Sequence, residues 1–477
     1  MLPLEEFKVL DTNAEQLGIP VSSLMEKAGQ GLAEFIREDS GPEDRILFLC
    51  GAGNNGGDSF VAARLLKDDF FIKVALAKPL TDAHSALCRE HLEKVRHLLA
   101  NNEELDFQKF DLIVDGLLGT GLKAEVREPY RSLIRRLQTF SGKIISVDVP
   151  SGFQSNLSVT PNATVTFHDL KEGMSEETCG RIVLKDIGIP PRAALYVNHG
   201  EFHLYPKPKA ASHKGENGKL LIIGGGPYTG AASLAGISAC RVGVDLLHIA
   251  TPARSFLPTS CYSPLFITHQ LDGDALGVSN VKPIEALMNH VNCLLIGPGL
   301  GHKDGTLKAI SKIIDGCAKP LVLDADALRV FDPKYSADLS SSTVVVTPHA
   351  REFERMASQE LPSDLDGRME SVKSFAFERN VTVLLKGDID IISDGVCIKL
   401  NDTGNPSMTV GGTGDVLAGI VAGLLSKGMK PFDAARLGAY MSGCAGDRAF
   451  LKRSYGMTAE DVSESIPSVL KARMRGL

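Results

Sequence analysis

The sequence predicts two α/β domains, each with a parallel β-sheet that is covered by helices. Two observations support this prediction. Short apolar, β-rich runs alternate with segments of helix length along nearly the whole chain, which is the pattern of strand–helix–strand units. This alternation is interrupted at 205–219 by a segment rich in Pro, Lys, Gly and Ser, and then it restarts. We therefore expect one domain at 1–206 and a second at 207–477.

The first domain contains four predicted strands, with helical patterns at 85–100 and 130–140 between them. The strands are expected at 45–50, 71–76, 111–116 and 143–148. Glycine-bearing loops follow three of these strands, at Gly51–Asp58, Asp115–Gly121 and Asp148–Gly152. Parallel α/β sheets bind ligands beyond the carboxyl ends of their strands, so the loops should meet at one edge. We expect a Rossmann-like, doubly wound parallel sheet with a site at that edge.

The second domain shows the same alternation and becomes mainly helical over 413–475. Its strands are expected at 219–226, 245–250, 292–297, 321–326, 343–348 and 381–387. Both domains contain a strand, a glycine loop and a helix start, but the residues that follow differ. We therefore interpret them as two unrelated α/β domains and not as an internal repeat.

Charge and cysteine content exclude several classes of protein. The formal net charge of -7 and the lack of a long basic stripe argue against nucleic-acid binding. No stretch approaches the 18 apolar residues of a membrane span, and the acidic N-terminal segment is unlike a signal peptide. The nine cysteines are odd in number and none has CxxC spacing, which indicates a reducing compartment. We expect a cytoplasmic protein that binds neither nucleic acid nor membranes.

The glycine-rich loop of the first domain, GAGNNGGDSF at 51–60, follows a strand and opens a helix, where backbone amides can approach a phosphate. It is neither a dinucleotide fingerprint nor a Walker A loop, and a capped tight turn would explain its glycines alone. Asp148, at another strand end, could act as general acid or base if burial tunes its pKa toward neutrality. Oxygen atoms of Asn55, Asp115 and Ser151 could hold a hard cation.

The most specific motif of the chain is NPSMTVGGTGDVLAGIVAGLL at 405–425. The amides of Gly412–Gly414 would point at an anion, with the dipole of the following helix behind them. Asp415 could take a proton from a hydroxyl while those amides stabilise a transferring phosphoryl group. A glycine-rich bend with an acidic first turn is the alternative.

Three further strand ends of the second domain carry polar side chains. Lys386 could reach a phosphate or border an adenosine site, and His349 could contact a substrate. Asp324 or Asp326 could position a metal-bound phosphate, or could cap the next helix. Each of these side chains also has an ordinary structural interpretation, so their meaning depends on whether the fold brings them together.

These strings of residues identify two families. CGAGNNGGDSFVAARLL, DGLLGTGL and SVDVPSG, with the opening DTNAEQLGIPVSSLMEKAG, resemble the NAD(P)HX epimerases over residues 1–200. SHKGENGKLLIIGG, GAASLA, IGPGLG, LDADAL, TPHAREF, LLKG and GGTGDVLAGI resemble the ADP- or ATP-dependent NAD(P)HX dehydratases over 212–470, which have a ribokinase-like fold. The chain thus resembles the bifunctional repair enzymes for hydrated NADH and NADPH.

The resemblance implies an isomerase and a lyase in one chain. The first domain would interconvert the R and S epimers of NAD(P)HX. The second would phosphorylate the hydroxyl of the S epimer from ADP or ATP and then expel phosphate to regenerate NAD(P)H. The fused layout resembles prokaryotic forms, which use ADP. A potassium ion in the first domain and Mg²⁺ with the nucleotide are implied as well, and we expect a homo-oligomer.

The resemblance also implies which residues form the sites. Asp148 and Asp415 would be catalytic, and potassium would be held by Asn55, Asp115 and Ser151. The substrate would contact Asn54, Asn55, Gly56, Gly57, Asp58, Gly119, Thr120, Gly121, Leu122, Lys123, Ala124, Glu125 and Asp148 in the first domain, and Ala231, Gly301, His349 and Asp415 in the second. The adenine nucleotide would contact Lys386, Gly387, Asp388, Ile389, Asp390, Gly412, Thr413 and Gly414.

Two positions depart from the family patterns. Ser59 stands where a glycine is usual, and because a hydroxymethyl group is small we expect tighter packing and an intact site. Arg351 replaces the glycine of the family's TPHxGE string, so that loop must accept a long cation and the fit of the substrate should change.

Two alternative functions remain. The second domain could be a kinase for a vitamin or a sugar, with the first domain as an accessory; the three matching loops of the first domain argue against this. The first domain could instead be a non-catalytic scaffold. Retention of Asp148 argues against that alternative, because a scaffold has no use for an acid in the cleft.

Overall fold

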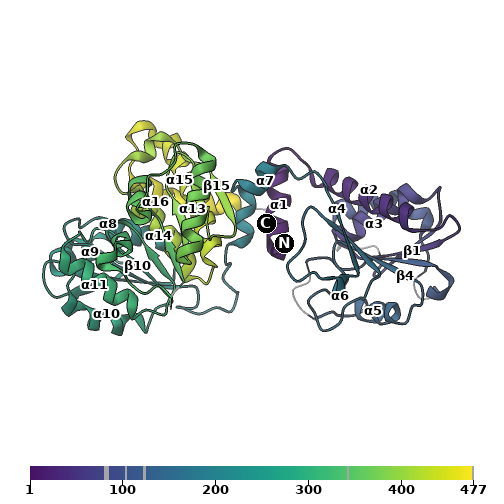
Figure 1. The fold of residues 1–477 in the computed structure, drawn as a ribbon, viewed down its shortest axis with the longest axis horizontal. Helices are drawn as coiled ribbons and strands as arrows, with labels where there is room; N and C mark the ends of the chain where they lie inside the picture. The colour runs from purple at the N-terminus through teal and green to yellow at the C-terminus, as the bar shows by residue number, and fades with distance from the viewer. Residues whose placement is uncertain (80–84, 102–104, 122–124, 341–342, 475–477) are drawn as a thin grey trace. The chain divides into compact units, whose positions relative to one another are not determined.

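The computed structural model describes residues 1–79, 85–101, 105–121, 125–340 and 343–474. The chain divides into two compact units, Met1–Ala193 and Ala194–Leu477. Each unit has its own β-sheet with helices on both faces (Figure 1). The two-domain α/β organisation that the sequence predicts is therefore confirmed.

The first unit is built on a six-stranded parallel sheet. Its strands are β1 (Arg45–Cys50), β2 (Phe71–Leu76), β3 (Leu112–Gly116), β4 (Lys143–Val147), β5 (Ala163–Phe167) and β6 (Arg181–Lys185). Its helices are α1 (Leu4–Gln16), α2 (Val21–Asp39), α3 (Asn54–Leu66), α4 (Ala86–Lys94), α5 (Tyr130–Gln138), α6 (Glu176–Cys179) and, at the division between the units, α7 (Pro191–Leu195).

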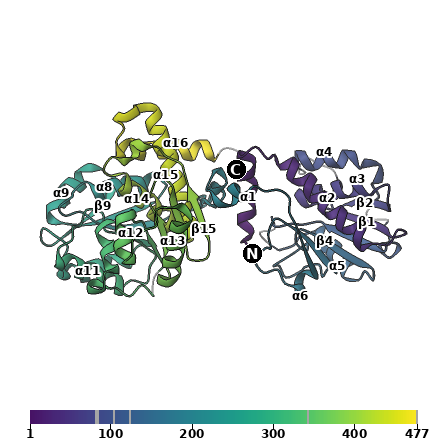
Figure 2. The ribbon, with the colours of Figure 1, turned by 45° about the horizontal axis from the view of Figure 1, so that its top comes forward.

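The strand order of this sheet is β2-β1-β3-β4-β5-β6, and the direction of winding reverses between β1 and β3. Helices α2 and α3 cover one face and α5 covers the other (Figures 1 and 2). Because the chain leaves β1 and β3 toward opposite faces, the loops after these two strands diverge and leave a crevice. Such a switch point is where open α/β sheets bind ligands, so the predicted doubly wound sheet positions its loops as expected.

The second unit is built on a nine-stranded sheet with the order β15-β14-β13-β12-β11-β10-β7-β8-β9. Its strands are β7 (Lys219–Ile223), β8 (Leu246–Pro252), β9 (Phe266–Leu271), β10 (Cys293–Ile296), β11 (Leu321–Leu323), β12 (Val344–Val346), β13 (Thr382–Leu385), β14 (Asp390–Ser393) and β15 (Ile398–Asn401). Only β14 runs antiparallel to its neighbours among the described strands. The winding reverses between β10 and β7, which gives this sheet a switch point of its own.

Two hydrophobic clusters cover the faces of this second sheet. One contains α8 (Ala231–Arg241), α14 (Thr413–Ser426), α15 (Pro431–Arg453) and α16 (Ala459–Arg473). The other contains α10 (Val281–Met288), α11 (Asp304–Asp315), α12 (Ala350–Ala357) and α13 (Leu365–Arg379), while α9 (Ala253–Tyr262) follows β8. Alternate residues of β7 belong to opposite clusters, which is the consequence of a strand buried on both faces.

The structural division precedes the boundary that the composition suggests. Residues 194–206, which the amino-acid pattern places in the first domain, pack on the second unit. The amide of Val197 donates to the carbonyl of Leu400 at 2.8 Å, and Phe202 is fully buried beside Tyr440 of α15. Apolar packing, and not the change in composition at 205–219, thus determines where the second unit begins.

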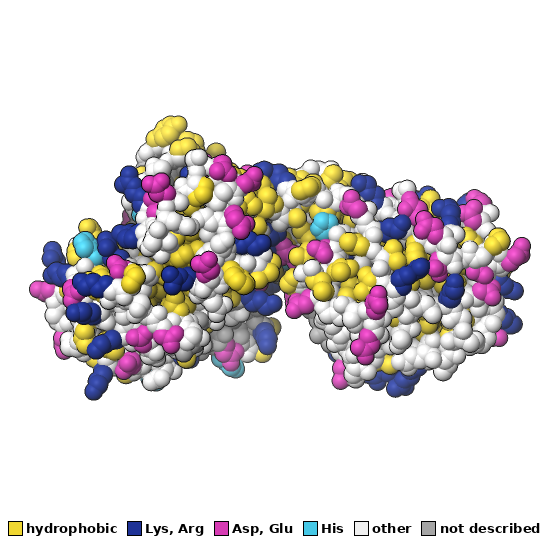
Figure 3. Space-filling view, viewed as in Figure 1, with side chains coloured by type: hydrophobic (Ala, Val, Ile, Leu, Met, Phe, Trp, Pro, Cys, Tyr) yellow, Lys and Arg dark blue, Asp and Glu magenta, His cyan; other side chains and the backbone are white. Residues whose placement is uncertain are grey.

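The surface carries charges of both signs. On the face shown in Figure 3, Lys and Arg side chains are interspersed with Asp and Glu, and the described residues form no continuous basic stripe there. Among the described helices, none is long and apolar enough to cross a membrane.

Candidate active sites in the two units

Three loops that contact one another border the crevice of the first unit. Helix α3 begins at Asn54 directly behind β1, and Asn55 Nδ2 donates to the carbonyl of Val147 at 2.6 Å. Asn55 Oδ1 lies so close to Gly119 that a Cβ there would be 2.1 Å away. The loops after β1, β3 and β4 are therefore held together through one asparagine, and Gly119 is required for its approach.

The third predicted loop is anchored by a buried carboxylate. Ser146 Oγ and Ser151 N donate to Asp115 Oδ2, both at 2.8 Å, and Ser151 Oγ donates to Oδ1 at 2.5 Å. Ser151 Oγ also lies 3.3 Å from the carbonyl of Leu118. Burial raises the pKa of Asp115 although these hydrogen bonds lower it. The structure thus brings together Asp115 and Ser151, two of the three predicted cation ligands.

Other members of the predicted substrate set have packing roles or lie outside the described residues. Gly56 and Gly57 are buried, against the carbonyl of Gly51 and the side chain of Met25. Glu125 is exposed. The expected contacts at Leu122, Lys123 and Ala124 lie outside the described residues.

The departure at Ser59 is accommodated inside α3. The side chain is fully buried, and its Oγ donates to the carbonyl of Asn55 at 2.7 Å. A Cβ at Gly116 would be 2.0 Å from this oxygen. The hydroxymethyl group therefore packs tightly against β3 and leaves the crevice open.

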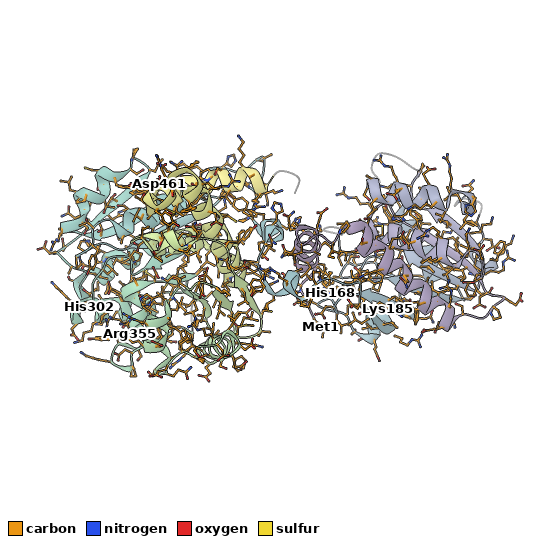
Figure 4. The ribbon with its side chains drawn as sticks, turned by 90° about the horizontal axis from the view of Figure 1, so that it is seen from above. Met1, His168, Lys185, His302, Arg355 and Asp461 are labelled. Atoms are coloured by element: carbon orange, nitrogen blue, oxygen red, sulfur yellow. The ribbon has the colours of Figure 1, made fainter. Side chains whose placement is uncertain are left out.

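Asp148 and His168 occupy matching positions at two neighbouring strand ends. Each has a φ of 66°, and each is the centre of a three-residue turn closed by a 2.8 Å hydrogen bond, Val149 N to Val147 O and Asp169 N to Phe167 O. Such γ-turns with positive φ are rare and strained, and strain of this kind concentrates at functional sites. His168 also donates its amide to Lys185 at the end of β6, and Figure 4 labels both side chains.

A cavity of about 110 Å³ lies against these turns. Its lining includes Asn54, Asn55, Asp58, Thr120 and Asp148 of the predicted set, and in addition Phe7, Asp11, His168 and Lys171. Lys171 is fully buried, and its ammonium lies 2.5 Å from Asp148 Oδ1. Burial, followed by the charge of Asp148, raises the pKa of both Asp58 and Asp11.

Three ionisable residues of this cavity, Asp11, His168 and Lys171, are not predicted from the sequence. Asp11 lies in α1 and Lys171 follows β5, far in sequence from the glycine-bearing loops. The β-branched run ATVTF at 163–167 was a signal for a fifth strand, and Lys171 would then have stood near a strand end.

The candidate site of the second unit is formed at the start of α14. Gly412 is the N-cap residue with a φ of 98°, a left-handed conformation that glycine adopts readily, and α14 begins at Thr413. The first amides of a helix lack partners within the helix and face an incoming anion. Asp415 lies in this first turn. Burial, followed by the charge of Asp324, raises its pKa to about 7.

Lys386 connects this turn to the neighbouring strand ends. Its ammonium lies 3.0 Å from Asp324 Oδ1 and beside Gly414, where a Cβ would be 3.5 Å away. Thr347 Oγ1 donates to the same oxygen of Asp324 at 2.8 Å. Burial lowers the pKa of Lys386, but the neighbouring carboxylates, with Asp324 first, raise it overall. Asp324 is thus the acid of LDADAL that lies at the site.

Other residues of the predicted set form hydrogen bonds that hold the loops around the second site in place. Asp326 Oδ2 accepts from the amide of Gly301 at 2.8 Å. Asp390 accepts from Gly387 N at 3.0 Å and from Asn401 Nδ2 at 2.9 Å, which closes the hairpin of β13 and β14. Burial raises the pKa of Asp390 to about 6. Asp388 is exposed and Ile389 half-buried in that hairpin, while Thr413 Oγ1 donates to the carbonyl of Met408 at 2.7 Å.

His349 lies next to Lys386, since the two residues form an isolated parallel bridge. His349 caps α12: its Nδ1 accepts from Glu352 N at 3.3 Å, and its amide donates to Glu352 Oε2 at 2.9 Å. Arg351 is exposed in the first turn of this helix. Ala231 begins α8 at the opposite side of the switch point, where Gly299 packs against it.

Known proteins match both units. Residues 220–468 match the NAD(P)H-hydrate dehydratase family, and residues 21–173 match the YjeF-related protein N-terminus. A solved structure from Bacillus subtilis, an ADP/ATP-dependent NAD(P)H-hydrate dehydratase co-crystallised with ATP/Mg²⁺, is 27% identical with a TM-score of 0.51. It covers 59% of this chain and 99% of its own. The second sheet therefore has the ribokinase-like fold of that enzyme, as the sequence predicts.

Relatives of the whole chain carry both units. A bifunctional NAD(P)H-hydrate repair enzyme of Methanothermobacter thermautotrophicus is 38% identical over 96% of this chain and 93% of its own length. A second, from Pyrobaculum aerophilum, is 37% identical over 98% of this chain and 97% of its own. Identity at this level over nearly the full length of both chains establishes the family. The chain belongs to the bifunctional NAD(P)H-hydrate repair enzymes.

Proposed function

We propose that the first unit epimerises R- and S-NAD(P)HX and that the second dehydrates the S epimer with ADP or ATP. One observation carries the second assignment: the amides at the start of α14, the ammonium of Lys386 and the carboxyl of Asp415 converge at one sheet edge. This arrangement provides an anion cradle, a cation and a base for phosphoryl transfer. A vitamin or sugar kinase would share these groups, but the match to whole repair enzymes favours the repair reaction.

In the second unit, Asp415 takes the proton of the C6 hydroxyl of the substrate. The oxygen of that hydroxyl then attacks the terminal phosphoryl group of the nucleotide. The Gly412–Gly414 amides and Lys386 stabilise the charge on the phosphoryl oxygens. The lone pair of the ring nitrogen then expels phosphate from C6, and loss of a C5 proton completes the dihydropyridine. A base whose pKa lies near 7 is suited to accept a proton at neutral pH.

In the first unit, Asp148 is the catalytic carboxylate, and Asn55, Asp115 and Ser151 would hold potassium. The donor set fits a monovalent cation, because it consists of oxygens and includes a carboxylate removed from water. The proton of Ser151 Oγ can turn to the carbonyl of Leu118 and free Asp115 Oδ1. The bound cation would neutralise this buried carboxylate and fix the loops that meet there.

We further propose that Mg²⁺ accompanies the nucleotide and that the enzyme acts in the cytoplasm as a homo-oligomer. The Bacillus subtilis dehydratase crystallised with ATP/Mg²⁺ supports the metal. The hydrated dinucleotide is proposed to contact His349, Gly301 and Ala231. Arg351 is proposed to alter that contact. The 386–390 hairpin would border the adenosine.

The experiment that tests the proposed function supplies separated R and S hydrates of NADH to the full-length protein with ADP, with ATP or without nucleotide. The return of NADH absorbance is followed. We expect the S epimer to be consumed only with a nucleotide, and the R epimer to follow faster than its spontaneous epimerisation. Consumption of S without nucleotide would refute the phosphoryl-transfer assignment, and spontaneous-rate loss of R would refute the epimerase.

A further inference from the structure

The cavity of the first unit contains more ionisable groups than one catalytic carboxylate requires. The carboxyls of Asp11, Asp58 and Asp148 and the ammonium of Lys171 all line it, with His168 beside them. They come from α1, α3 and the turns after β4 and β5, so the fold collects them from four separate segments.

The ammonium of the buried Lys171 contacts several oxygen atoms. In addition to Asp148, its Nζ donates to Thr166 Oγ1 at 2.8 Å, to the carbonyl of Phe167 at 2.9 Å, and to that of Asp169 at 3.3 Å. It also lies 4.2 Å from the centre of the Phe7 ring in α1. A buried ammonium held in this way forms an ion pair with the carboxylate that it touches, which is Asp148.

Helix α1 is fixed over this lysine by the backbone. Leu2 N donates to the carbonyl of Leu170 at 2.8 Å, and Glu172 N donates to the carbonyl of Leu2 at 2.9 Å. Asp11 follows Phe7 by one helical turn, so both side chains lie on the same side of α1 and face the cavity. Asp11 is therefore part of the lining of the cavity.

The balance of charges bears on which carboxyls hold protons. Three ionised carboxylates beside one ammonium would leave two uncompensated negative charges around the cavity. Like charges repel and burial makes each charge more costly, so the pKa values of Asp11 and Asp58 are raised. The pKa of Asp11 is about 6, so this carboxyl holds a proton at lower pH, while the ammonium contacts Asp148. Asp11 and Asp148 line the same cavity and can therefore act there as an acid and a base.

From this geometry, and on the basis of the epimerase function proposed above, we propose that Asp11 is a second catalytic residue. It is the general acid that works together with the general base Asp148. Asp148 accepts the proton of the C6 hydroxyl, the C6–O bond becomes a carbonyl, and the N1–C6 bond breaks with its electron pair remaining on N1. Asp11 gives its proton to N1.

The ring-opened aldehyde turns about its C5–C6 bond, and the steps reverse on the other face. N1 attacks C6, Asp11 takes back the N1 proton, and Asp148 returns its proton to the oxygen. Every proton is restored at the end, no co-reactant is consumed, and only the configuration of C6 has changed. One carboxyl alone would have to leave a charge on N1 or to carry a proton across the ring.

The ionisation of Asp11 suits this role. Burial, then Asp148, raises the pKa of Asp11 to about 6, although Lys171 lowers it. An acid whose pKa lies near the working pH can donate a proton and recover it at a small cost in free energy in either direction. Asp58 is buried, and this burial raises its pKa well above the usual range, so its proton is less available for transfer.

The test uses the full-length protein without nucleotide, so that the second unit is idle. A single purified epimer of NADHX is supplied, and the appearance of the other is measured by chromatography across pH, with the spontaneous rate subtracted. For wild type, kcat/KM should fall as pH rises through about 6, because Asp11 loses its proton there. Asp11→Asn should lose about 10²- to 10⁴-fold in rate, and its remaining rate should lack this alkaline decline.

Asp68→Asn is the matched control, since Asp68 is exposed on the same unit, and it should behave as wild type. The first unit of Asp11→Asn should be no less stable to heat than that of wild type, and the nucleotide-dependent dehydration of the S epimer should be unchanged, which separates loss of the acid from loss of the fold. If Asp11→Asn epimerises at the wild-type rate, or keeps the alkaline decline, the inference is wrong and His168 is the next candidate acid. Absence of epimerisation by wild type would instead overturn the proposed function itself.

An isotope experiment tests the bonds that break. Substrate with ¹⁸O in its C6 hydroxyl should keep the label during inversion, because ring opening breaks N1–C6 and not C6–O. Loss of the label at each inversion would show that hydroxide leaves and would overturn the ring-opening step.

Discussion

The carboxyl of Asp415 should reduce the stability of the second unit, so that Asp415→Asn stabilises the fold while it abolishes dehydration. Burial, followed by the charge of Asp324, raises its pKa from 3.8 to about 7. One pKa unit corresponds to about 1.36 kcal/mol, so ionising this carboxyl in the folded protein costs on the order of 4 kcal/mol more than in the unfolded chain. Asn has nearly the same size without the charge. The attraction to Lys386 is already included in this pKa, but Asp415 is only half-buried and solvent screens part of the cost, so we expect a net gain of about 2 kcal/mol at pH 8.

The sign of the pH dependence follows from the raised pKa. The folded state holds the proton of Asp415 more tightly than the unfolded state does. Its contribution to stability is therefore fully present below about pH 3.8 and is lost as the pH rises to about 7. The difference in unfolding free energy between Asp415→Asn and wild type should grow across this window and then remain constant.

Calorimetry of the full-length protein without nucleotide measures this difference. The transition of the second unit is identified by its shift when ATP and Mg²⁺ are added to wild type. A gain of about 2 kcal/mol should raise its Tm by roughly 4–8 °C at pH 8. Asp274→Asn, at an exposed loop position of the same unit, should leave it unchanged. A lower Tm for Asp415→Asn, or a gain independent of pH, would refute the reasoning.

The same protein sample supplies the catalytic half of the prediction. Dehydration of the S epimer should fall by about 10²- to 10⁴-fold in Asp415→Asn, the usual contribution of a general base. In wild type, kcat/KM should rise with pH and level off above about 7, where the carboxylate is ionised. A variant that is more stable and inactive cannot have lost activity by misfolding. Near wild-type turnover would exclude Asp415 as the base.

Three further predictions concern other parts of the chain. Asp148→Asn should leave nucleotide-dependent consumption of the S epimer untouched and reduce that of the R epimer to its spontaneous rate; unchanged clearance of R would point to another base. Lys386→Met should weaken ATP binding at least tenfold by titration calorimetry, since it removes the cation beside Gly414, and unaltered affinity would place the phosphates elsewhere. A fragment 194–477 should unfold at least about 10 °C above a fragment 210–477, because loss of a buried Phe such as Phe202 alone costs roughly 3–5 kcal/mol, and equal melting would contradict the structural boundary.

Most strands that the sequence predicts are continuous apolar runs. The predicted runs at 45–50 and 71–76 coincide with β1 and β2, and those at 111–116 and 143–148 overlap β3 and β4. The missed strands β6 and β9 lie at sheet edges with largely half-exposed side chains, so they leave no continuous apolar run for the pattern to detect. The sequence also misses the buried strand β5, in which threonines interrupt the apolar residues, and the short strands β14 and β15.

The same limit applies to the sites. A glycine or an acid at the end of a strand can be recognised from the local sequence, because the loop that follows a parallel strand must turn at the sheet edge. Asp115 and Asp148 are predicted in this way, and Asp415 is predicted from the glycine-rich motif that opens α14. Asp11 gave no such sign, since an acid in an amphipathic helix is usually a solvated residue. Only the folded chain shows that α1 carries it into the cavity.

Comparing the two sites shows why each uses a lysine differently. In the second unit the ammonium of Lys386 contacts Asp324 and not Asp415, so the base keeps a pKa near 7 while the lysine remains beside Gly414 to meet a phosphoryl group. In the reaction proposed for the first unit no phosphoryl group is transferred, and Lys171 contacts Asp148, the proposed catalytic carboxylate. Asp11, whose pKa is raised to about 6, then serves as the proton donor of the proposed mechanism. In the two proposed reactions, phosphoryl transfer needs a cation that can reach the substrate, whereas ring opening needs a proton donor near the base, and the placement of the lysine in each unit agrees with these needs.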